Sequence, residues 1–253
     1  MATKDGFCFV SHEGLTGRGS SEVASYLHQY LLKVDERGCK KVELFSDGCS
    51  GQNKNSIVPS MLLHFVERSQ SVEEVTLMFF ETNHGQSEGD SIHSSIETQM
   101  RQVGESFIPS QLEMLIRMAR KVPRPYIVKS VQSSHIYDWK SYSQNRGLLR
   151  VRSTESGTKV DWTRFMQIQV RKSEDDTIMF KYSHADETYE VLRIGESRRN
   201  SGHIRQEEPE PLYPLGYHKL SEAKYQDLQS LCKGPTPVVV HPDYQDFYRL
   251  LHH

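Results

Sequence analysis

Long apolar runs are missing from this sequence. Only 36% of its 253 residues are hydrophobic, and no stretch of 18 residues is continuously apolar. A transmembrane helix needs about 20 mainly apolar residues, so we expect no membrane partner. The N-terminal stretch MATKDGFCFVSHEG lacks the apolar core of a signal peptide. We therefore expect a nuclear or cytoplasmic protein that is not secreted.

Cysteine is also scarce, and its spacing carries no motif. The four cysteines are Cys8, Cys39, Cys49 and Cys232, and none belongs to a Cys-x-x-Cys pair. This spacing argues against a zinc knuckle and against a disulfide framework, and it fits a reducing compartment. The glycine-bearing stretch GRGS at 17–20 lacks the glycine and lysine spacing of a nucleotide-binding loop.

Charge is nearly balanced over the whole chain but not along it. The formal net charge is −2, yet residues 124–205 hold 15 Lys/Arg against 10 Asp/Glu, while both flanking segments are acidic. A basic segment with interspersed aromatic residues suits an anionic partner, and DNA is the partner we expect. The same composition also suits an ordinary solvated β surface.

Hydrophobic periodicity predicts alternating strands and helices over residues 6–121. We expect strands over 6–12, 41–46 and 73–80. We expect helices over about 20–38, 56–70, 90–103 and 110–121. This alternation predicts an α/β fold whose sheet contains parallel strands.

Beyond residue 125 the pattern changes to short β runs separated by polar turns. The runs YIVKSVQ, GLLRVRS, FMQIQVRK, TIMFKYS and YEVLRI predict an antiparallel subdomain, and 197–211 reads as a linker before a helix over 221–231. We therefore expect three regions: an α/β core, a β-rich basic subdomain, and a linker with a C-terminal helical tail. Their bounds are 1–125, 126–196 and 197–253.

Two polar loops follow neighbouring predicted strands. The loop FSDGCSGQNKN places Asp47 at the end of the second strand, and the loop after the third strand leads to Asp90 at a helix start. His93 and Glu97 follow on the same face of that helix. Ligands of parallel sheets collect beyond the carboxyl ends of the strands. Carboxylates placed there are typical ligands of Mg²⁺ or Mn²⁺, and two such ions about 4 Å apart can support phosphodiester cleavage.

Each of these residues also has a purely structural interpretation. Asp47, followed by Gly48, suits an Asx turn. Asp90 suits a helix N-cap, with His93 and Glu97 on a solvated helix face. Spacing does not choose between Asp90 and Glu97 as the metal ligand.

Other polar residues near the loops have two interpretations as well. Gln52, Asn53, Lys54 and Asn55 suit contacts with a DNA backbone, or they build the loop itself. Arg18, between two glycines, suits an anion contact at a helix N-terminus or a simple turn.

Four segments carry a resemblance to a known family. They are FVSHEGLTGRGSSEVASYL, FSDGCSGQNKN, HGQSEGDSIHSSIE and IPSQLEMLIRMARK, in this order. The chain resembles an uncharacterised family of transposon-derived proteins with a ribonuclease-H-like core of the DDE/D transposase and integrase type. HPDYQDFYRLL, near the C-terminus, resembles the end of that family, whereas the likeness is weak from about 135 to 210.

The resemblance implies a metal-dependent nuclease or strand-transfer site. Asp47 falls at the family's second acid, and Asp90 or Glu97 at its third. His84 is a loop histidine that suits positioning of the scissile phosphate, assistance in product release, or a plain surface position. No earlier strand with an inward aspartate precedes these, since Asp5 lies in a polar N-terminal stretch. Two functions therefore stay open: a metal-dependent DNA nuclease, or a domesticated and catalytically inactive module that binds DNA or another protein.

Overall fold

The computed structural model of the protein describes residues 4–81, 88–148, 151, 153–154, 156–194 and 208–253. The chain divides into two compact units, each assembled from segments that are distant in sequence. The sheet unit comprises Arg18–Gly85 and His135–Leu212, and the terminal unit comprises Met1–Gly17, Gln86–Ser134 and Tyr213–His253. Each unit has its own sheet and its own apolar clusters.

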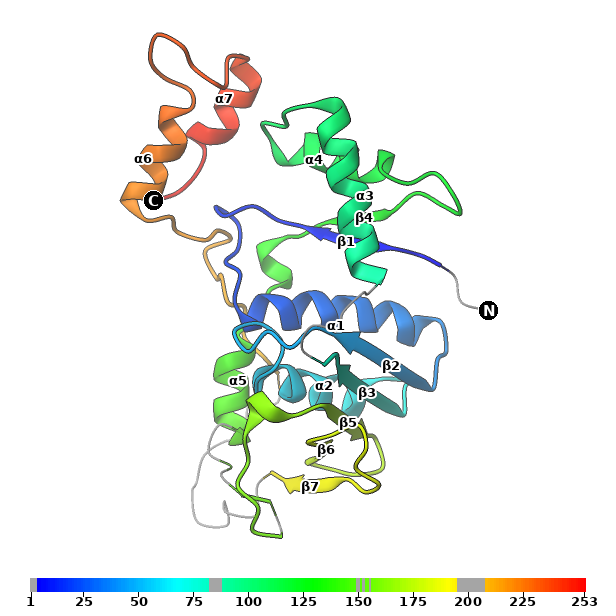
Figure 1. The fold of residues 1–253 in the computed structure, drawn as a ribbon. Coiled ribbons are helices and arrows are strands. Elements are labelled where there is room, and N and C mark those ends of the chain that lie inside the picture. Colours follow the sequence, from blue (N-terminus) through cyan, green and yellow to red (C-terminus); the bar gives the residue numbers. More distant parts are fainter. Residues whose placement is uncertain (1–3, 82–87, 149–150, 152, 155, 195–207) are drawn as a thin grey trace. The chain divides into compact units, whose positions relative to one another are not determined.

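The sheet unit is built on a five-stranded mixed sheet (Figure 1). In spatial order its strands are β2 (Lys41–Ser46), β3 (Glu74–Phe79), β5 (Gln167–Arg171), β6 (Thr177–Lys181) and β7 (Glu190–Arg193). β2 and β3 are parallel and pair Val42 with Val75, while the other neighbouring strands are antiparallel. The prediction of a mixed α/β fold is thereby confirmed.

Three α-helices pack in the sheet unit: α1 (Ser20–Glu36), α2 (Ile57–Arg68) and α5 (Trp139–Arg146). α2 contacts β3, β5 and β6, and its Met61, Leu62 and Phe65 are almost completely buried. A helix that is apolar on most sides belongs inside a core. The short 3₁₀ helix η3 (Trp162–Arg164) also belongs to the sheet unit, and η1 (Ser133–His135) lies at the boundary between the two units in the sequence.

Asp35 at the end of α1 fastens the turn between α2 and β3. Its carboxylate accepts hydrogen bonds from the Ser69 hydroxyl at 2.5 Å and from the backbone N–H of Ser71 at 2.7 Å. Gln70 and Val72 donate their backbone N–H groups to the same carboxylate. Burial opposes the charged form, but these hydrogen bonds prevail and lower the pKa of Asp35 to about 2.

The terminal unit has a two-stranded parallel sheet of β1 (Phe7–Val10) and β4 (Ile127–Ser130). Its helices are α3 (Glu88–Val103), α4 (Pro109–Met118), α6 (Glu222–Ser230) and α7 (Pro242–Arg249). One apolar cluster centres on Val10, Ile116 and Tyr126, and another on Tyr248 and its neighbours. None of the helices within the described ranges is long and apolar enough to cross a membrane.

The structure divides the chain differently from the expected three regions. β5, β6 and β7 do not form a sheet of their own, because β3 pairs with β5 and places Val75 opposite Val170 and Leu77 opposite Ile168. These apolar pairs continue the buried face of β2 and β3, so the expected boundary at 125/126 does not separate two sheets. The expected first strand, now β1, lies in the two-stranded sheet instead.

One element was missed and one expected strand is not found as a strand. Residues 139–146 form α5, which Asp138 caps by accepting a hydrogen bond from the Ser141 N–H at 2.9 Å. Gly147 ends the helix in the left-handed conformation, with φ of 89°. The described part of GLLRVRS holds no strand, only an isolated bridge at Ser153. The β pattern treats residues 139–146 as a polar turn between two β runs, and it therefore misses the capped helix that they form.

Candidate functional site at the carboxyl edge of the sheet

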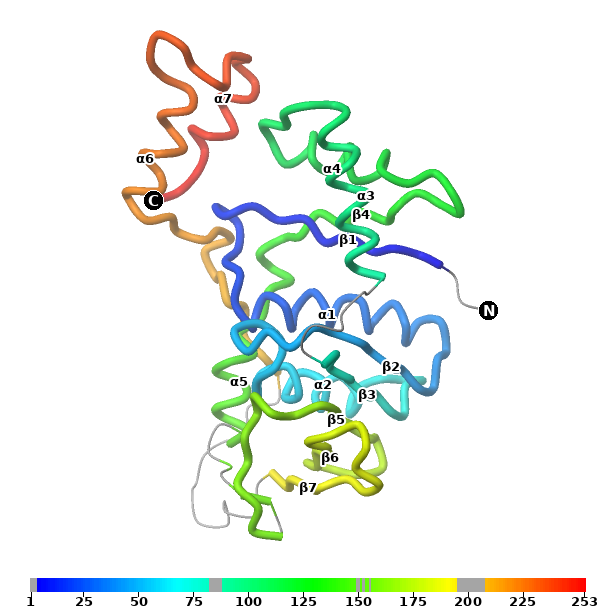
Figure 2. Tube along the Cα trace, in the orientation of Figure 1, coloured from blue at the N-terminus to red at the C-terminus, as the bar shows by residue number. Residues whose placement is uncertain are grey.

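The Asp47 loop, residues 47–55, begins where β2 ends. β2 and β3 are parallel, so they end at the same edge, and Phe80 N–H donates to the Ser46 carbonyl at 2.9 Å. α2 begins directly after the loop, and the first turn of α1 lies beside it (Figure 2). Strand ends and two helix N-termini therefore surround the loop, which is where ligands of α/β sheets collect.

The backbone of the Asp47 loop folds back on a single carbonyl group. The Cys49 carbonyl accepts hydrogen bonds from the N–H groups of Gln52, Asn53 and Lys54, at 3.1, 2.8 and 3.0 Å. This convergence closes a tight turn and makes the loop an ordered feature. It also brings the side chain of Asn53 back to the end of β2.

Asp47 is exposed, and its neighbours hold its orientation. Its Oδ1 accepts a hydrogen bond from Asn53 Nδ2 at 3.0 Å and a longer one from Ser46 Oγ at 3.4 Å. Asn53 Nδ2 also donates to Ser46 Oγ at 2.7 Å. The three side chains form one polar group at the carboxyl end of β2. Asp47 thus lies directly after a strand end, where the sequence predicts it.

Asn55 connects the loop to both helices. Its Oδ1 accepts from the N–H groups of Ile57 at 2.9 Å and Val58 at 3.3 Å, which caps α2. Its Nδ2 donates to Ser20 Oγ at 3.1 Å, and the Ser20 hydroxyl donates to the Gly51 carbonyl at 2.8 Å. The amide of Asn55 therefore builds the loop, which is one of the two roles predicted for this residue.

Two residues predicted to bind substrate, Gln52 and Lys54, belong to this loop, and a third, Arg18, lies just before the start of α1. Lys54 Nζ lies 5.2 Å from the centre of the Phe79 ring and 3.8 Å from Met166 Sδ. Burial lowers the pKa of Lys54, against a smaller raising effect of Asp161. Gln52 is exposed, and Arg18 is exposed two residues before Ser20. The structure thus brings Arg18, the loop residues and Asp47 to the same part of the sheet unit.

The second group of predicted acids lies on α3 in the terminal unit. Asp90, His93 and Glu97 are exposed, while Ile92 and Ile96 contact the apolar cluster on the other side of the helix. Glu97 Oε2 forms an ion pair with Arg101 at 3.3 Å. Asp47 belongs to the sheet unit, so the two groups of acids are in different units. His84 lies outside the described residues.

The oxygen atoms around Asp47 fit a hard divalent cation. Asn53 Oδ1 is buried and has no hydrogen-bond partner within the described part of the chain, and the Asp47 carboxylate and Ser46 hydroxyl are adjacent. Mg²⁺ uses one or two carboxylates and completes its shell with water and phosphate oxygens. Over the described ranges no cluster of three or more His, Cys, Asp or Glu side chains is arranged for a metal. Asp47 and Asn53 are therefore a partial ligand set.

Several cations of the basic segment are used inside the sheet unit. Arg146 is buried and bonded to Glu67, to Asp176 at 2.6 Å and to the Tyr142 hydroxyl at 3.1 Å. Burial disfavours its charge, but these acceptors prevail and raise the pKa of Arg146. Arg171 bonds to Glu74 at 2.9 Å. Arg146 and Arg171 therefore have carboxylate partners within the sheet unit.

Sequence reasoning missed two residues that reach the same edge of the sheet. His184 Nε2 lies 2.9 Å from the carbonyl of Phe79, the last residue of β3. Asp161 caps η3 by accepting from the Thr163 N–H at 3.0 Å, and it influences Lys54. Both lie more than 80 residues beyond β3 in the sequence, and only the pairing of β5 with β3, and of β6 with β5, brings them here.

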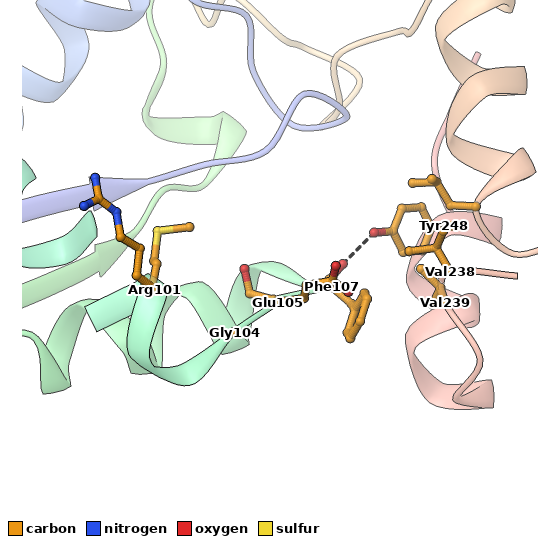
Figure 3. A pocket seen from close by; sticks show the side chains of 10 residues that line it. Arg101, Gly104, Glu105, Phe107, Val238, Val239 and Tyr248 are labelled. Carbon is orange, nitrogen blue, oxygen red and sulfur yellow. Dashed lines mark hydrogen bonds between the residues drawn. The ribbon is translucent and has the colours of Figure 1, made fainter. Parts of the chain in front are cut away.

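A separate pocket of about 490 Å³ lies within the terminal unit. Its walls come from the end of α3, the segment that follows it, and the segments around α6 and α7 (Figure 3). Tyr248 lines the pocket and donates its hydroxyl to the Phe107 carbonyl at 2.6 Å. Arg101 and Glu105 are its charged residues, and most other lining residues are apolar.

The fold defines a mixed α/β protein with a polar loop at a strand end. Residues 4–142 match the profile of the family described as "Domain of unknown function (DUF8701)". The match covers more than half of the chain, so the chain belongs to this family. Comparison with curated proteins finds no match, and comparison with solved structures finds none either.

Proposed function

We propose that this protein is a transposase-derived, ribonuclease-H-like protein that binds DNA at the carboxyl edge of the sheet unit. Its reaction is metal-dependent phosphodiester cleavage or strand transfer, with Asp47 as a ligand of Mg²⁺ or Mn²⁺. The observation that carries the proposal is the position of Asp47 at the end of β2, where Asn53 Nδ2 holds its carboxylate at 3.0 Å. Asp90 and Glu97 on α3 stay the other ligands that the sequence predicts.

The residues of the Asp47 loop have separate tasks in this proposal. Asn53 orients the carboxylate of Asp47, and its own amide oxygen is a second candidate ligand. The N-termini of α1 and α2 favour the negative charge of a phosphate. Lys54 and Arg18 supply positive charge near the same loop. When bound, the metal would polarise the phosphodiester and stabilise developing negative charge.

Calorimetric titration of Mn²⁺ into the full chain tests the metal site. Asp47→Asn keeps an oxygen that can accept the Asn53 hydrogen bond but removes the negative charge. We expect wild-type protein to bind Mn²⁺ and the variant to lose at least about tenfold in affinity. Asp175→Asn is the matched control. Asp175 is an exposed carboxylate in the turn between β5 and β6, which lies at the opposite end of the strands from the Asp47 loop. Equal binding by wild type and Asp47→Asn would remove Asp47 from the site.

A second measurement separates the catalytic function from the binding function. Fluorescence anisotropy with a labelled DNA duplex measures binding, and nicking of supercoiled plasmid with Mn²⁺ measures cleavage. Nicking by wild type that Asp47→Asn abolishes supports the nuclease. Mn²⁺-independent DNA binding without nicking supports the domesticated, inactive DNA-binding module. A chain that binds neither Mn²⁺ nor DNA contradicts both.

The acids of α3 are tested individually in the same assays. Asp90→Asn and Glu97→Gln each remove one charge from the exposed side of the helix. The variant that weakens Mn²⁺ binding identifies the ligand between these two residues. Glu97→Gln also removes the ion pair with Arg101, so Arg101→Gln serves as its control. Unchanged binding in both variants would confine the metal site to the Asp47 loop.

A further inference from the structure

β2 is an edge strand of the five-stranded sheet, and one side of its backbone has no partner strand among the described residues. On the paired side, the carbonyls of Lys40 and Ser46 accept N–H groups that flank β3. In a parallel ladder alternate residues turn both their N–H and C=O groups to the same neighbour. The N–H and C=O groups of Lys41, Glu43 and Phe45 therefore point away from β3, along the open edge.

The side chains at this edge are exposed, and one of them is a large aromatic. Phe45 is 61% exposed although it lies within the paired part of β2, opposite Met78 of β3. It stacks on Phe80, with ring centres 6.1 Å apart and an interplanar angle of 23°. Lys41 and Glu43 are exposed beside it. Exposed edge strands with apolar side chains are templates for pairing with another strand.

The order of charges along β2 matches that of a second, antiparallel β2. When Val42 faces Val42 of a second copy, Lys41 of each copy lies opposite Glu43 of the other. Opposite charges directly across an antiparallel pair are stabilising, and two such pairs form at once by symmetry. The shifted arrangement centred on Leu44 places Glu43 opposite Phe45, and Lys41 then lies opposite Asp47, which is beyond the end of β2.

We propose that β2 is a homodimer interface, which pairs antiparallel with β2 of a second copy of this chain in the Val42-centred register. The five-stranded sheet then continues from one copy into the other. Phe45 and Phe80 of each copy extend the contact beyond the paired backbones. This inference stands apart from the proposed nuclease function, because no residue of the Asp47 loop carries it.

Sedimentation velocity of the full chain over a concentration series measures the association. We expect wild type to be a dimer in the micromolar range. Lys41→Glu and Glu43→Lys each place like charges opposite one another twice, and each should weaken the dimer about tenfold or more. An equimolar mixture of the two variants restores both opposite-charge pairs, so the mixture should form a heterodimer as well as wild type does. The double variant K41E/E43K should form a homodimer again.

Arg193→Glu provides the matched control, because Arg193 is an exposed cation on β7, the opposite edge strand. It should leave the dimer unchanged. Far-ultraviolet circular dichroism first confirms that every variant is folded. A wild type that stays monomeric overturns the proposal, as does a mixture of folded variants that fails to associate. Loss of the dimer in Arg193→Glu alone would place the interface at β7 and overturn it as well.

Discussion

The sheet unit and the terminal unit bury their hydrophobic side chains in different ways. In the sheet unit, one continuous cluster extends from α1 through α2 to β7, and Leu62, Phe65 and Ile168 are almost fully buried within it. The terminal unit has two smaller clusters, around Ile116 and around Tyr248. Local stability follows the number of buried apolar contacts. The Asp47 loop therefore belongs to the unit with the larger apolar core, which is the unit expected to have the higher local stability.

The largest effect of a single substitution is expected from shortening a leucine in each unit. Leu62→Ala should lower the free energy of unfolding of the sheet unit by about 2–5 kcal/mol, because Leu62 is fully buried and its closely packed surroundings leave little room for relaxation. Leu115→Ala on α4 removes the same atoms from a buried side chain of the terminal unit, whose apolar clusters are smaller. Its cost should be about 1–3 kcal/mol and should affect the terminal unit.

Both tryptophans, Trp139 and Trp162, belong to the sheet unit, so tryptophan emission reports this unit alone. Urea unfolding followed by tryptophan emission and by circular dichroism therefore separates the two variants. Leu62→Ala should shift the emission transition, and Leu115→Ala should shift only the dichroism transition. Equal shifts of the emission transition in the two variants would refute the contrast between the units.

Acid should destabilise the sheet unit through two histidines. Burial lowers the pKa of His28 to about 4, partly offset by Glu208, and burial with nearby Arg68 lowers the pKa of His64 to about 3. The unfolded chain takes up these protons near pH 6.5 and the folded chain does not. The stability that the neutral histidines confer is thus present above pH 6.5. It falls by about 1.4 kcal/mol per pH unit for each histidine as the pH drops toward the folded pKa.

Urea unfolding at several pH values, read by tryptophan emission, measures this slope. The double variant His28→Gln/His64→Gln should flatten the profile between pH 6.5 and 4. Substituting the exposed His93 on α3 should leave the profile unchanged. A double variant with the wild-type slope would assign the acid sensitivity to the carboxylates instead.

The smallest effect is expected at the hydrogen bond between Tyr248 and the Phe107 carbonyl. Tyr248→Phe removes the hydroxyl that donates over 2.6 Å and should cost about 1 kcal/mol of local stability in the terminal unit. Hydrogen exchange should quicken at backbone amides near Phe107 and in α7. Tyr225→Phe, on α6, is a control. Unchanged exchange near Phe107 would show that this bond contributes nothing to local stability.

The elements of the first half of the chain could be predicted because their patterns are local. Alternation of Val42 and Leu44 with polar residues marks β2, and the apolar spacing after Ser20 marks α1. α5 was missed because its buried residues, Trp139, Tyr142 and Arg146, include a charge that periodicity counts as exposed. α7 was expected only as part of a helical tail, and it forms over Pro242–Arg249.

The candidate site was predictable only in part. Asp47 at a strand end and Asn55 as a loop-building residue follow from the order of residues near β2. The Asn53–Asp47 hydrogen bond at 3.0 Å depends on the turn around the Cys49 carbonyl, and no spacing rule specifies it. The approach of His184 to Phe79 depends on strand pairing over more than 100 residues. The sites proposed for Asp90 and Glu97 stay predictions.

The sequence by itself determined the local elements, the polar loop after β2 and the absence of long apolar runs, because these depend on neighbouring residues. Only the tertiary structure decided that β5, β6 and β7 join β2 and β3 in one sheet, while β1 pairs with β4 elsewhere. The physical reason is that strands pair so as to bury a whole apolar face, as the pairing of Leu77 with Ile168 does. Such a face forms only when segments that are distant in the sequence come together.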